Sequence, residues 1–124
     1  MFAHFMIGSN GLERARVFYD ATFAAFGDQP GEMDPRGRLI YVHEGGRLII
    51  TKAINGQAAT SANGGTTGIA AASPDNDLAW PWAGTEHRGN AVESPPAERP
   101  NGTFAAYLRY LDGNKLIAGS KPTG

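Results

Sequence analysis

Three histidines are the side chains in this sequence with the clearest capacity for chemistry, and the chain has no cysteine. His4 lies in a short apolar segment, where a neutral imidazole could orient a polar ligand or act as a general base. The alternative for His4 is a partly buried strand histidine held by a backbone or side-chain partner. His43 stands beside Glu44, and His87 ends a polar segment, so we expect both at a solvated surface. His4 is therefore the one candidate for a catalytic or ligand-binding histidine.

Other catalytic and nucleotide-binding motifs are missing from the sequence. Its Asn-Gly pairs are typical of turns, and none begins the glycine-rich loop and helix that bind phosphate. No serine has the spacing of a nucleophile elbow. Lys plus Arg (11) nearly equals Asp plus Glu (12), so we expect no surface for nucleic acid or for an anionic membrane. No apolar run approaches the roughly 18 residues of a membrane span, and a cytoplasmic location is expected.

The elements that would position these residues begin with a strand at 2–7. Ser9, Asn10 and Gly11 could then cap a helix, whose apolar residues recur at spacings of three and four up to Phe26. Gly27 is predicted to end this helix. A turn-rich stretch at 29–37 follows, with at most a short strand at 31–34, and then the two arms of a hairpin at 38–43 and 47–52.

The second half of the sequence repeats this order after a small, polar stretch that offers no side chains to a core. A helix should run from Ser73 toward His87, and Pro81 inside it predicts a kink near Trp80. The rings of Trp80 and Trp82 should point to different faces, one against the sheet and the other over a ligand or a partner subunit. The remaining elements are predicted as strands at 66–72, 91–94, 103–111 and 115–119, with a loop at 95–102.

This order of strand, helix and strands occurs twice and predicts an internal repeat. Its clearest trace in the sequence is residues 45–49 against residues 113–117, since a glycine-containing turn precedes a basic-Leu-Ile stretch in both. The chain of 124 residues is long enough for one core and not for several. We expect one domain at 1–124, with module one at about 1–53, a linker at 54–65 and module two at 66–119.

The helix opening and one late turn give the sequence a family resemblance. The helix opening combines Leu12, Ala15 and the pair Phe18-Tyr19, and the turn is Asp112-Gly113-Asn114. With His4 ahead of them, these residues resemble the vicinal-oxygen-chelate superfamily of glyoxalases, bleomycin-resistance proteins and extradiol dioxygenases. The resemblance covers nearly the whole chain. It implies an α+β fold, in which two βαβββ modules form a cupped, incompletely closed mixed sheet with flanking helices.

The resemblance also implies where a metal ion would bind. Metal-dependent members carry one ligand on the first strand of each module and a Glu on the last strand of each. The corresponding positions here are His4, Thr66 or Thr67, Ile49 or Ile50, and Ile117. An aliphatic side chain cannot coordinate a cation, and one imidazole falls short of the roughly three protein ligands of a catalytic site. We therefore expect no metal and no other cofactor.

The function implied is metal-independent binding of a small organic molecule in the cup of the sheet or in a dimer cleft, as in the bleomycin-resistance type. One alternative is a glyoxalase-related lyase, isomerase or dioxygenase with an atypical site around His4. Another is a dimeric protein with no small-molecule site. A homodimer is expected in each case. The residues predicted to contact a ligand are His4, Tyr41, Trp82, Phe104, Tyr107 and Arg109.

Overall fold

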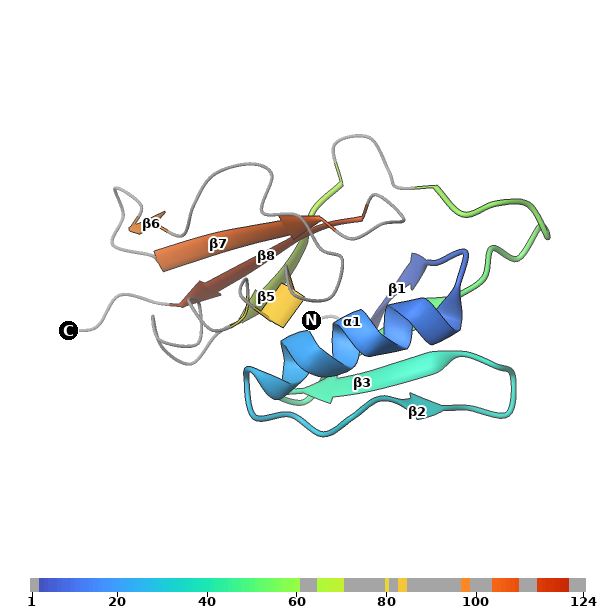
Figure 1. Ribbon diagram of the computed structural model, residues 1–124, viewed down its shortest axis with the longest axis horizontal. Helices are drawn as coiled ribbons and strands as arrows, with labels where there is room; N and C mark the ends of the chain where they lie inside the picture. Colours follow the sequence, from blue (N-terminus) through green and yellow to red (C-terminus); the bar gives the residue numbers. More distant parts are fainter. Residues whose placement is uncertain are drawn as a thin grey trace.

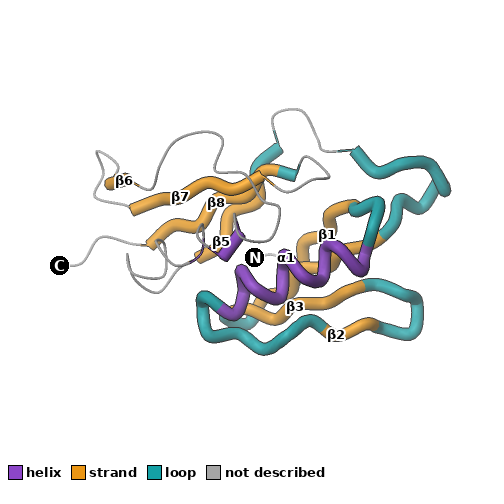
Figure 2. Tube along the Cα trace, in the orientation of Figure 1, coloured by secondary structure: helices purple, strands orange, loops and turns teal. Residues whose placement is uncertain are grey.

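Two four-stranded sheets form the body of the molecule, and helical segments lie on one side of them (Figures 1 and 2). The computed structural model describes residues 3–60, 65–70, 80, 83–84, 97–98, 104–109 and 114–120. In these ranges no helix is long and apolar enough to cross a membrane. The mixed, unclosed sheets agree with the predicted α+β fold. They are two separate sheets, because no strand ladder joins them within the described residues.

The first sheet follows the predicted order of elements. Its components are β1 (His4–Gly8), α1 (Leu12–Ala24), β2 (Glu32–Met33), β3 (Leu39–His43) and β4 (Gly46–Thr51). The strands lie side by side in the order β1-β4-β3-β2. Strand β4 pairs parallel with β1 and antiparallel with β3. This arrangement leaves β1 as one edge of the sheet.

The second sheet repeats this topology. It contains β5 (Thr67–Ala70), β6 (Ala97–Glu98), β7 (Phe104–Arg109) and β8 (Lys115–Ser120), in the order β5-β8-β7-β6. Strand β8 pairs parallel with β5 and antiparallel with β7. The predicted internal repeat is therefore confirmed at the level of topology. Trp80, Ala83 and Gly84 are helical, and the rest of the predicted second helix and the strand at 91–94 lie outside the described residues.

The prediction of a loop at 95–102 is wrong at Ala97 and Glu98. These two residues pair with Ala105 and Phe104 as the edge strand β6. Backbone hydrogen bonds to β7 define this strand, and a two-residue stretch carries no hydrophobic alternation by which a sequence could reveal it.

The start of α1 differs from the predicted cap. Its N-cap is Gly11, which makes no side-chain capping bond. Ser9 Oγ instead accepts the Gly11 N–H at 3.2 Å. The Asn10 amide engages the backbone of Ala59, donating to its carbonyl at 3.0 Å and accepting its N–H at 2.6 Å. Ala59 is buried, so the stretch read as a linker does contribute to the core.

The end and the buried face of α1 agree with the predicted pattern. Gly27 has a φ of 88°, and the next N–H, from Asp28, reaches back to the carbonyl of Phe23 at 3.1 Å. A left-handed glycine followed by such a bond is a common helix ending. The buried residues of the helix recur at spacings of three and four and are Ala15, Phe18, Tyr19, Thr22 and Phe23.

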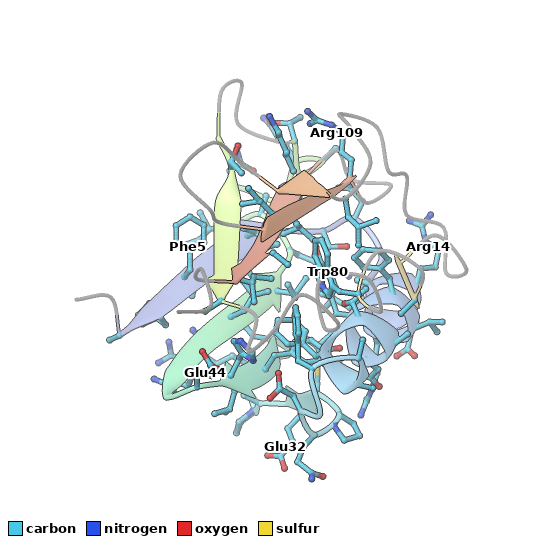
Figure 3. The ribbon with its side chains drawn as sticks, turned by 90° about the vertical axis from the view of Figure 1, so that its left-hand side faces the viewer. Phe5, Arg14, Glu32, Glu44, Trp80 and Arg109 are labelled. Carbon is cyan, nitrogen blue, oxygen red and sulfur yellow. The ribbon has the colours of Figure 1, made fainter. Side chains whose placement is uncertain are left out.

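One hydrophobic core is shared by the two modules. Trp80 is fully buried and stacks on Phe26, with ring centroids 6.1 Å apart and planes at 17°. Leu108 of β7 and Leu116 of β8 belong to the same buried cluster as Phe23 of α1. Figure 3 shows Trp80 between α1 and the strands of the second sheet. One tryptophan of the pair therefore packs in the core as expected, whereas Trp82 lies outside the described residues.

The β2–β3 turn contains a carboxylate whose protonation should weaken the fold. Asp34 accepts the backbone N–H groups of Arg38 at 2.8 Å and Arg36 at 2.9 Å, and the Arg38 Nε–H at 2.7 Å. The backbone bond from Arg38, followed by its side chain, lowers the pKa of Asp34. A lowered carboxyl pKa stabilises the folded state above the unfolded value of about 3.9, and this contribution disappears as the pH falls through the folded value.

We accordingly expect Asp34→Ala to lower the free energy of unfolding at neutral pH by more than it does near pH 3. Urea denaturation of both proteins at the two pH values measures this difference. An equal loss at both values would show that the carboxylate charge contributes nothing to the turn.

Candidate functional site

The two faces of the first sheet have different surroundings. Leu39, Tyr41, Leu48 and Ile50 belong to the core cluster that includes the buried face of α1. Because side chains alternate along a strand, their neighbours in sequence lie on the opposite side, which is called the open face below. The residues of the open face are His4, Met6, Glu32, Ile40, Val42, Arg47 and Ile49.

The open face consists of two cross-strand rows. In the first row Ile49 pairs with Met6 on one side and Ile40 on the other, and Ile40 pairs in turn with Glu32. This row is apolar and ends in a carboxylate. In the second row Arg47 pairs with His4 and with Val42. Apolar surface and separated polar groups therefore lie side by side, as they do in sites for small molecules.

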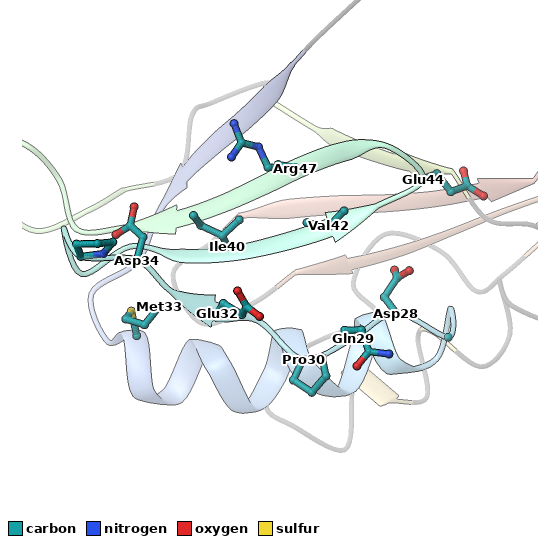
Figure 4. Close-up of a pocket in the computed structure, with 12 residues that line it drawn as sticks. Asp28, Gln29, Pro30, Glu32, Met33, Asp34, Ile40, Val42, Glu44 and Arg47 are labelled. Atoms are coloured by element: carbon teal, nitrogen blue, oxygen red, sulfur yellow. The ribbon is translucent and has the colours of Figure 1, made fainter.

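A hollow of about 780 Å³ lies on the β2–β3 side of this face (Figure 4). Ile40 and Val42 contribute apolar surface from β3, and the loop between α1 and β2 forms the opposite wall. Val42 is 60% exposed. Four carboxylate side chains and one guanidinium line the hollow, and they are Asp28, Glu32, Asp34, Glu44 and Arg47.

A hydrogen-bond network fixes the loop that walls the hollow. The Asp20 carboxylate of α1 accepts the Tyr41 hydroxyl at 2.6 Å and the Gly31 N–H at 3.0 Å. Arg16 donates to the Gly31 carbonyl at 3.1 Å. Burial of the phenol, followed by its bond to Asp20, raises the pKa of Tyr41 far above its ordinary value. Tyr41 thus lies in the core, where it holds this loop, and not on the open face.

The ladder register identifies the counterpart of His4 in the second module. Leu48 pairs with Phe5, and its counterpart Leu116 pairs with Thr67. Phe5 and Thr67 are therefore equivalent positions. The residues before them, His4 and Thr66, are then equivalent as well. The register thus selects Thr66 from the two threonines that the sequence left open.

The side chains at the four implied metal positions do not fit a metal ion. Ile49 shares the open face with His4, but its side chain has no donor atom. Its counterpart Ile117, which pairs with Gly68, has no donor atom either. Thr66 offers one hydroxyl. In the described part of the chain, no three His, Asp or Glu side chains are grouped so that they could hold a metal ion. The donor set therefore gives no basis for a step through a metal ion.

Three further predicted site residues lie on β7 of the second sheet. Arg109 of β7 is half-buried and pairs with Lys115. Tyr107 pairs with Ile117 and Phe104 with Ser120, and their side chains lie outside the described part. The prediction that these residues and His4 contact one ligand remains a prediction.

The sequence reading missed the residues that shape the hollow. The sequence predicted Ile40, Val42 and Arg47 only as parts of strands, and Glu32 only as part of a turn-rich stretch with at most a short strand. The run Leu39–His43 is apolar at nearly every position, so its alternation gives no sign of which side is exposed. One partial sign of the exposed side is present in the neighbouring strand Gly46–Thr51, where a single arginine precedes the apolar residues.

His43 was expected at a solvated surface, and this prediction is wrong. Its side chain is only 14% exposed. The Asp28 carboxylate stands 2.6 Å from one ring nitrogen, and the Ala70 carbonyl of β5 stands 2.5 Å from the other. Asp28 is 15 residues from His43 in the sequence and Ala70 is 27 residues from it. A sequence does not show that two such distant segments meet at one imidazole.

Solved structures resemble this chain over nearly its full length. A glyoxalase/bleomycin resistance protein from Albidiferax ferrireducens T118 is 42% identical, covers 98% of each chain and has a TM-score of 0.92. A glyoxalase-related enzyme from Fulvimarina pelagi is 19% identical, with coverage of 100% of this chain and 92% of the other and a TM-score of 0.76. For a lactoylglutathione lyase from Agrobacterium tumefaciens the identity is 18%, the coverage 97% and 92%, and the TM-score 0.68. Neither a family model nor a curated protein matches the sequence.

Proposed function

The chain belongs to the glyoxalase/bleomycin-resistance proteins of the vicinal-oxygen-chelate superfamily, and from this premise we propose that it binds a small organic molecule on the open face without a metal ion. The observation that carries this proposal is the hollow of about 780 Å³ over an apolar floor. Binding in such a hollow requires shape, apolar contact and a few polar anchors. It does not require the donors that are replaced by isoleucine at positions 49 and 117.

The lining of the hollow favours a particular kind of molecule. Two of its carboxylates already have side-chain partners, since Asp28 lies against His43 and Asp34 against Arg38. Glu32 and Glu44 are exposed and lie toward different ends of the hollow (Figure 4). A ligand with an apolar body and a cationic or hydrogen-bond-donating group would contact the floor and reach one of these carboxylates. We therefore propose this class over anionic compounds.

His4, Arg47 and residues of the second module would complete the site in this proposal. His4 and Arg47 form the neighbouring row of the open face and could bind an oxygen atom of the ligand. Tyr107 occupies the register position of β7 that matches Ile40 in β3, since each pairs with the isoleucine of the last strand. Arg109 lies two residues further along the same strand. These roles extend the proposal to the residues first suggested by the sequence.

We also propose that two copies associate through exposed apolar surface around this site. Met6 is 43% exposed and Val42 60% exposed, both on the open face. Burying apolar surface of this kind stabilises association by about 25 cal/mol per Å² before the costs of binding. Sedimentation of the purified protein would then give twice the chain mass of 13.1 kDa, whereas a monomer at all concentrations would exclude this arrangement.

A matched pair of substitutions tests the binding proposal. Val42→Arg places a long cationic side chain in the hollow, and Val17→Arg places the same side chain on the outer surface of α1, where Val17 is 56% exposed. Thermal-shift screening with cationic aromatic compounds and small anionic metabolites would be run on the wild type and both variants. A compound at 100 times its dissociation constant should stabilise the wild type by about 2.7 kcal/mol.

We expect compounds that stabilise the wild type and Val17→Arg to lose this effect in Val42→Arg. Without compound, Val17→Arg should melt close to the wild type. Val42 also belongs to the surface proposed for association, so the stabilisation by a compound is measured for each variant relative to its own melting temperature without compound. Stabilisation that survives in Val42→Arg would place the ligand elsewhere. Stabilisation by the anionic compounds alone would contradict the proposed ligand class.

A further inference from the structure

The edge strands β1 and β5 of the two modules face each other across two clefts, and this boundary is called the seam below. Within the described residues no strand ladder crosses this seam. Two side chains of the described part cross it instead, and each contacts the carbonyl at the end of an edge strand. Asn114 donates to the carbonyl of Gly8 at 2.8 Å, and His43 contacts the carbonyl of Ala70 at 2.5 Å. Gly8 and Ala70 are equivalent positions of the repeat, so the two contacts fasten opposite ends of the seam.

The surroundings of His43 determine which form of the imidazole fits. One ring nitrogen lies 2.6 Å from the Asp28 carboxylate and the other 2.5 Å from the Ala70 carbonyl. A carbonyl oxygen only accepts hydrogen bonds, and an ionised carboxylate does the same. With Asp28 ionised, both acceptors are served at once only when both nitrogens carry hydrogen, as in the imidazolium form.

Charged and aromatic groups surround the ring. Glu44, in the turn after β3, brings a carboxylate oxygen to 3.9 Å from the ring nitrogen that faces Ala70. Arg47 of β4 lines the same cleft as His43, with its side chain on the open face of the sheet. Phe23 of α1 and Phe26, which follows the helix, contribute rings at 5.9 and 5.0 Å between centroids. Strand β5 has no charged side chain, so the charged groups next to the ring are the carboxylates of Asp28 and Glu44.

We propose that His43 is a pH-sensitive latch that closes one end of the seam between the modules. When the imidazolium loses a proton, the remaining hydrogen serves only one of the two acceptors. If it stays with the carboxylate, the stronger acceptor, the lone pair of the other nitrogen faces the Ala70 carbonyl. This end of the seam then separates, while the Asn114 amide, which does not titrate, holds the other end as a hinge.

A cleft of about 450 Å³ lies beside the latch and would widen when the latch opens. Its apolar lining includes Phe5 of β1, Leu48 of β4 and Ile69 of β5. Ile69 is partly buried against the core when the seam is closed. Its accessibility therefore reports on the state of the seam.

The absence of native cysteine permits a direct test with single thiols. Ile69→Cys places a thiol in the cleft, and Ile54→Cys places one at a fully exposed position. The labelling rate at position 69 is divided by that at position 54 at each pH, which removes the pH dependence of thiol reactivity itself. We expect this ratio to rise severalfold from a pH well below to a pH well above the range in which imidazole titrates.

Two substitutions of His43 show whether the latch causes this change. His43→Arg keeps a positive charge and several donors at every pH, so the ratio should stay low throughout. His43→Phe keeps a ring without donors, so the ratio should stay high throughout. A flat ratio in the protein with native His43, or an unchanged pH response in either variant, would overturn the proposal. If circular dichroism shows that His43→Phe does not fold, the native and arginine series alone decide the question.

Discussion

Replacing Trp80 by alanine is expected to lower the free energy of unfolding by about 3–5 kcal/mol, the range for removal of a large buried aromatic side chain. Trp80 is fully buried and stacks on Phe26, which follows α1 in the first module. Leu108 and Leu116 of the second sheet belong to the same core cluster. Because the indole lies between the two modules, its loss should weaken both of them together. Chemical denaturation followed by far-UV circular dichroism measures the change.

Val17→Ala on α1 is the control for this substitution. Val17 is 56% exposed, so its truncation should change the free energy of unfolding by no more than about 0.5 kcal/mol. A single cooperative transition is expected for Trp80→Ala as well as for the wild type. A loss below about 1 kcal/mol, or a second transition in the variant, would show that the modules do not share one core.

A second large effect is expected from Gly31→Ala, near the upper end of the roughly 1–3 kcal/mol that overpacking costs. An added Cβ would lie 2.6 Å from Cζ of Tyr41 and 2.9 Å from Cδ1 of Leu39. The Tyr41 ring cannot move aside easily, because it stacks on Phe23 at 4.9 Å and its hydroxyl binds Asp20 at 2.6 Å. The clash would therefore displace the loop that walls the hollow, and ligand affinity should fall together with stability.

Gly46→Ala is the matched control for Gly31→Ala. An added Cβ at Gly46 would meet only the His43 carbonyl, at an ordinary distance of 3.6 Å. The free energy of unfolding should remain unchanged or rise by up to about 1 kcal/mol, because alanine restricts the unfolded chain. Equal losses in both variants would mean that the Tyr41 contact does not control the loop.

Much of the fold follows from local patterns in the sequence. The helical spacing that ends at Phe26 and the left-handed Gly27 reveal α1. The glycine turn at 45–46 separates the two strong strands of the first sheet. These signals lie in short stretches, and the chain repeats their order. The short strand β6 carries no such signal, since only its pairing with β7 defines it.

The site was less accessible to prediction because it depends on which face of a strand is covered. Tyr41 and Val42 are neighbours in one apolar run, yet Tyr41 lies beneath α1 and Val42 on the open face. Sequence alternation separates them without telling which is inside. The ladder register settles this, and it also selects Thr66 as the counterpart of His4.

His43 illustrates a different limit. Beside a glutamate at a hairpin turn, a histidine has the sequence context of a surface residue. Its actual environment comes from Asp28 and from Ala70 of the other module. Contacts between segments that are distant in the chain leave no local trace, so such a latch can be found only in the folded structure.

Metal content tests most directly the claim that this chain binds its ligand without a metal ion, since one imidazole cannot replace a full set of metal ligands. The wild type and His4→Ala would be incubated with zinc, manganese or nickel, separated from free metal by gel filtration and analysed by mass spectrometry. We predict the same metal content in both proteins, well below one ion per chain. A chelator should also leave unchanged the thermal stabilisation of the wild type by those compounds that fail to stabilise Val42→Arg. One tightly bound ion per wild-type chain that is lost in His4→Ala would contradict the claim.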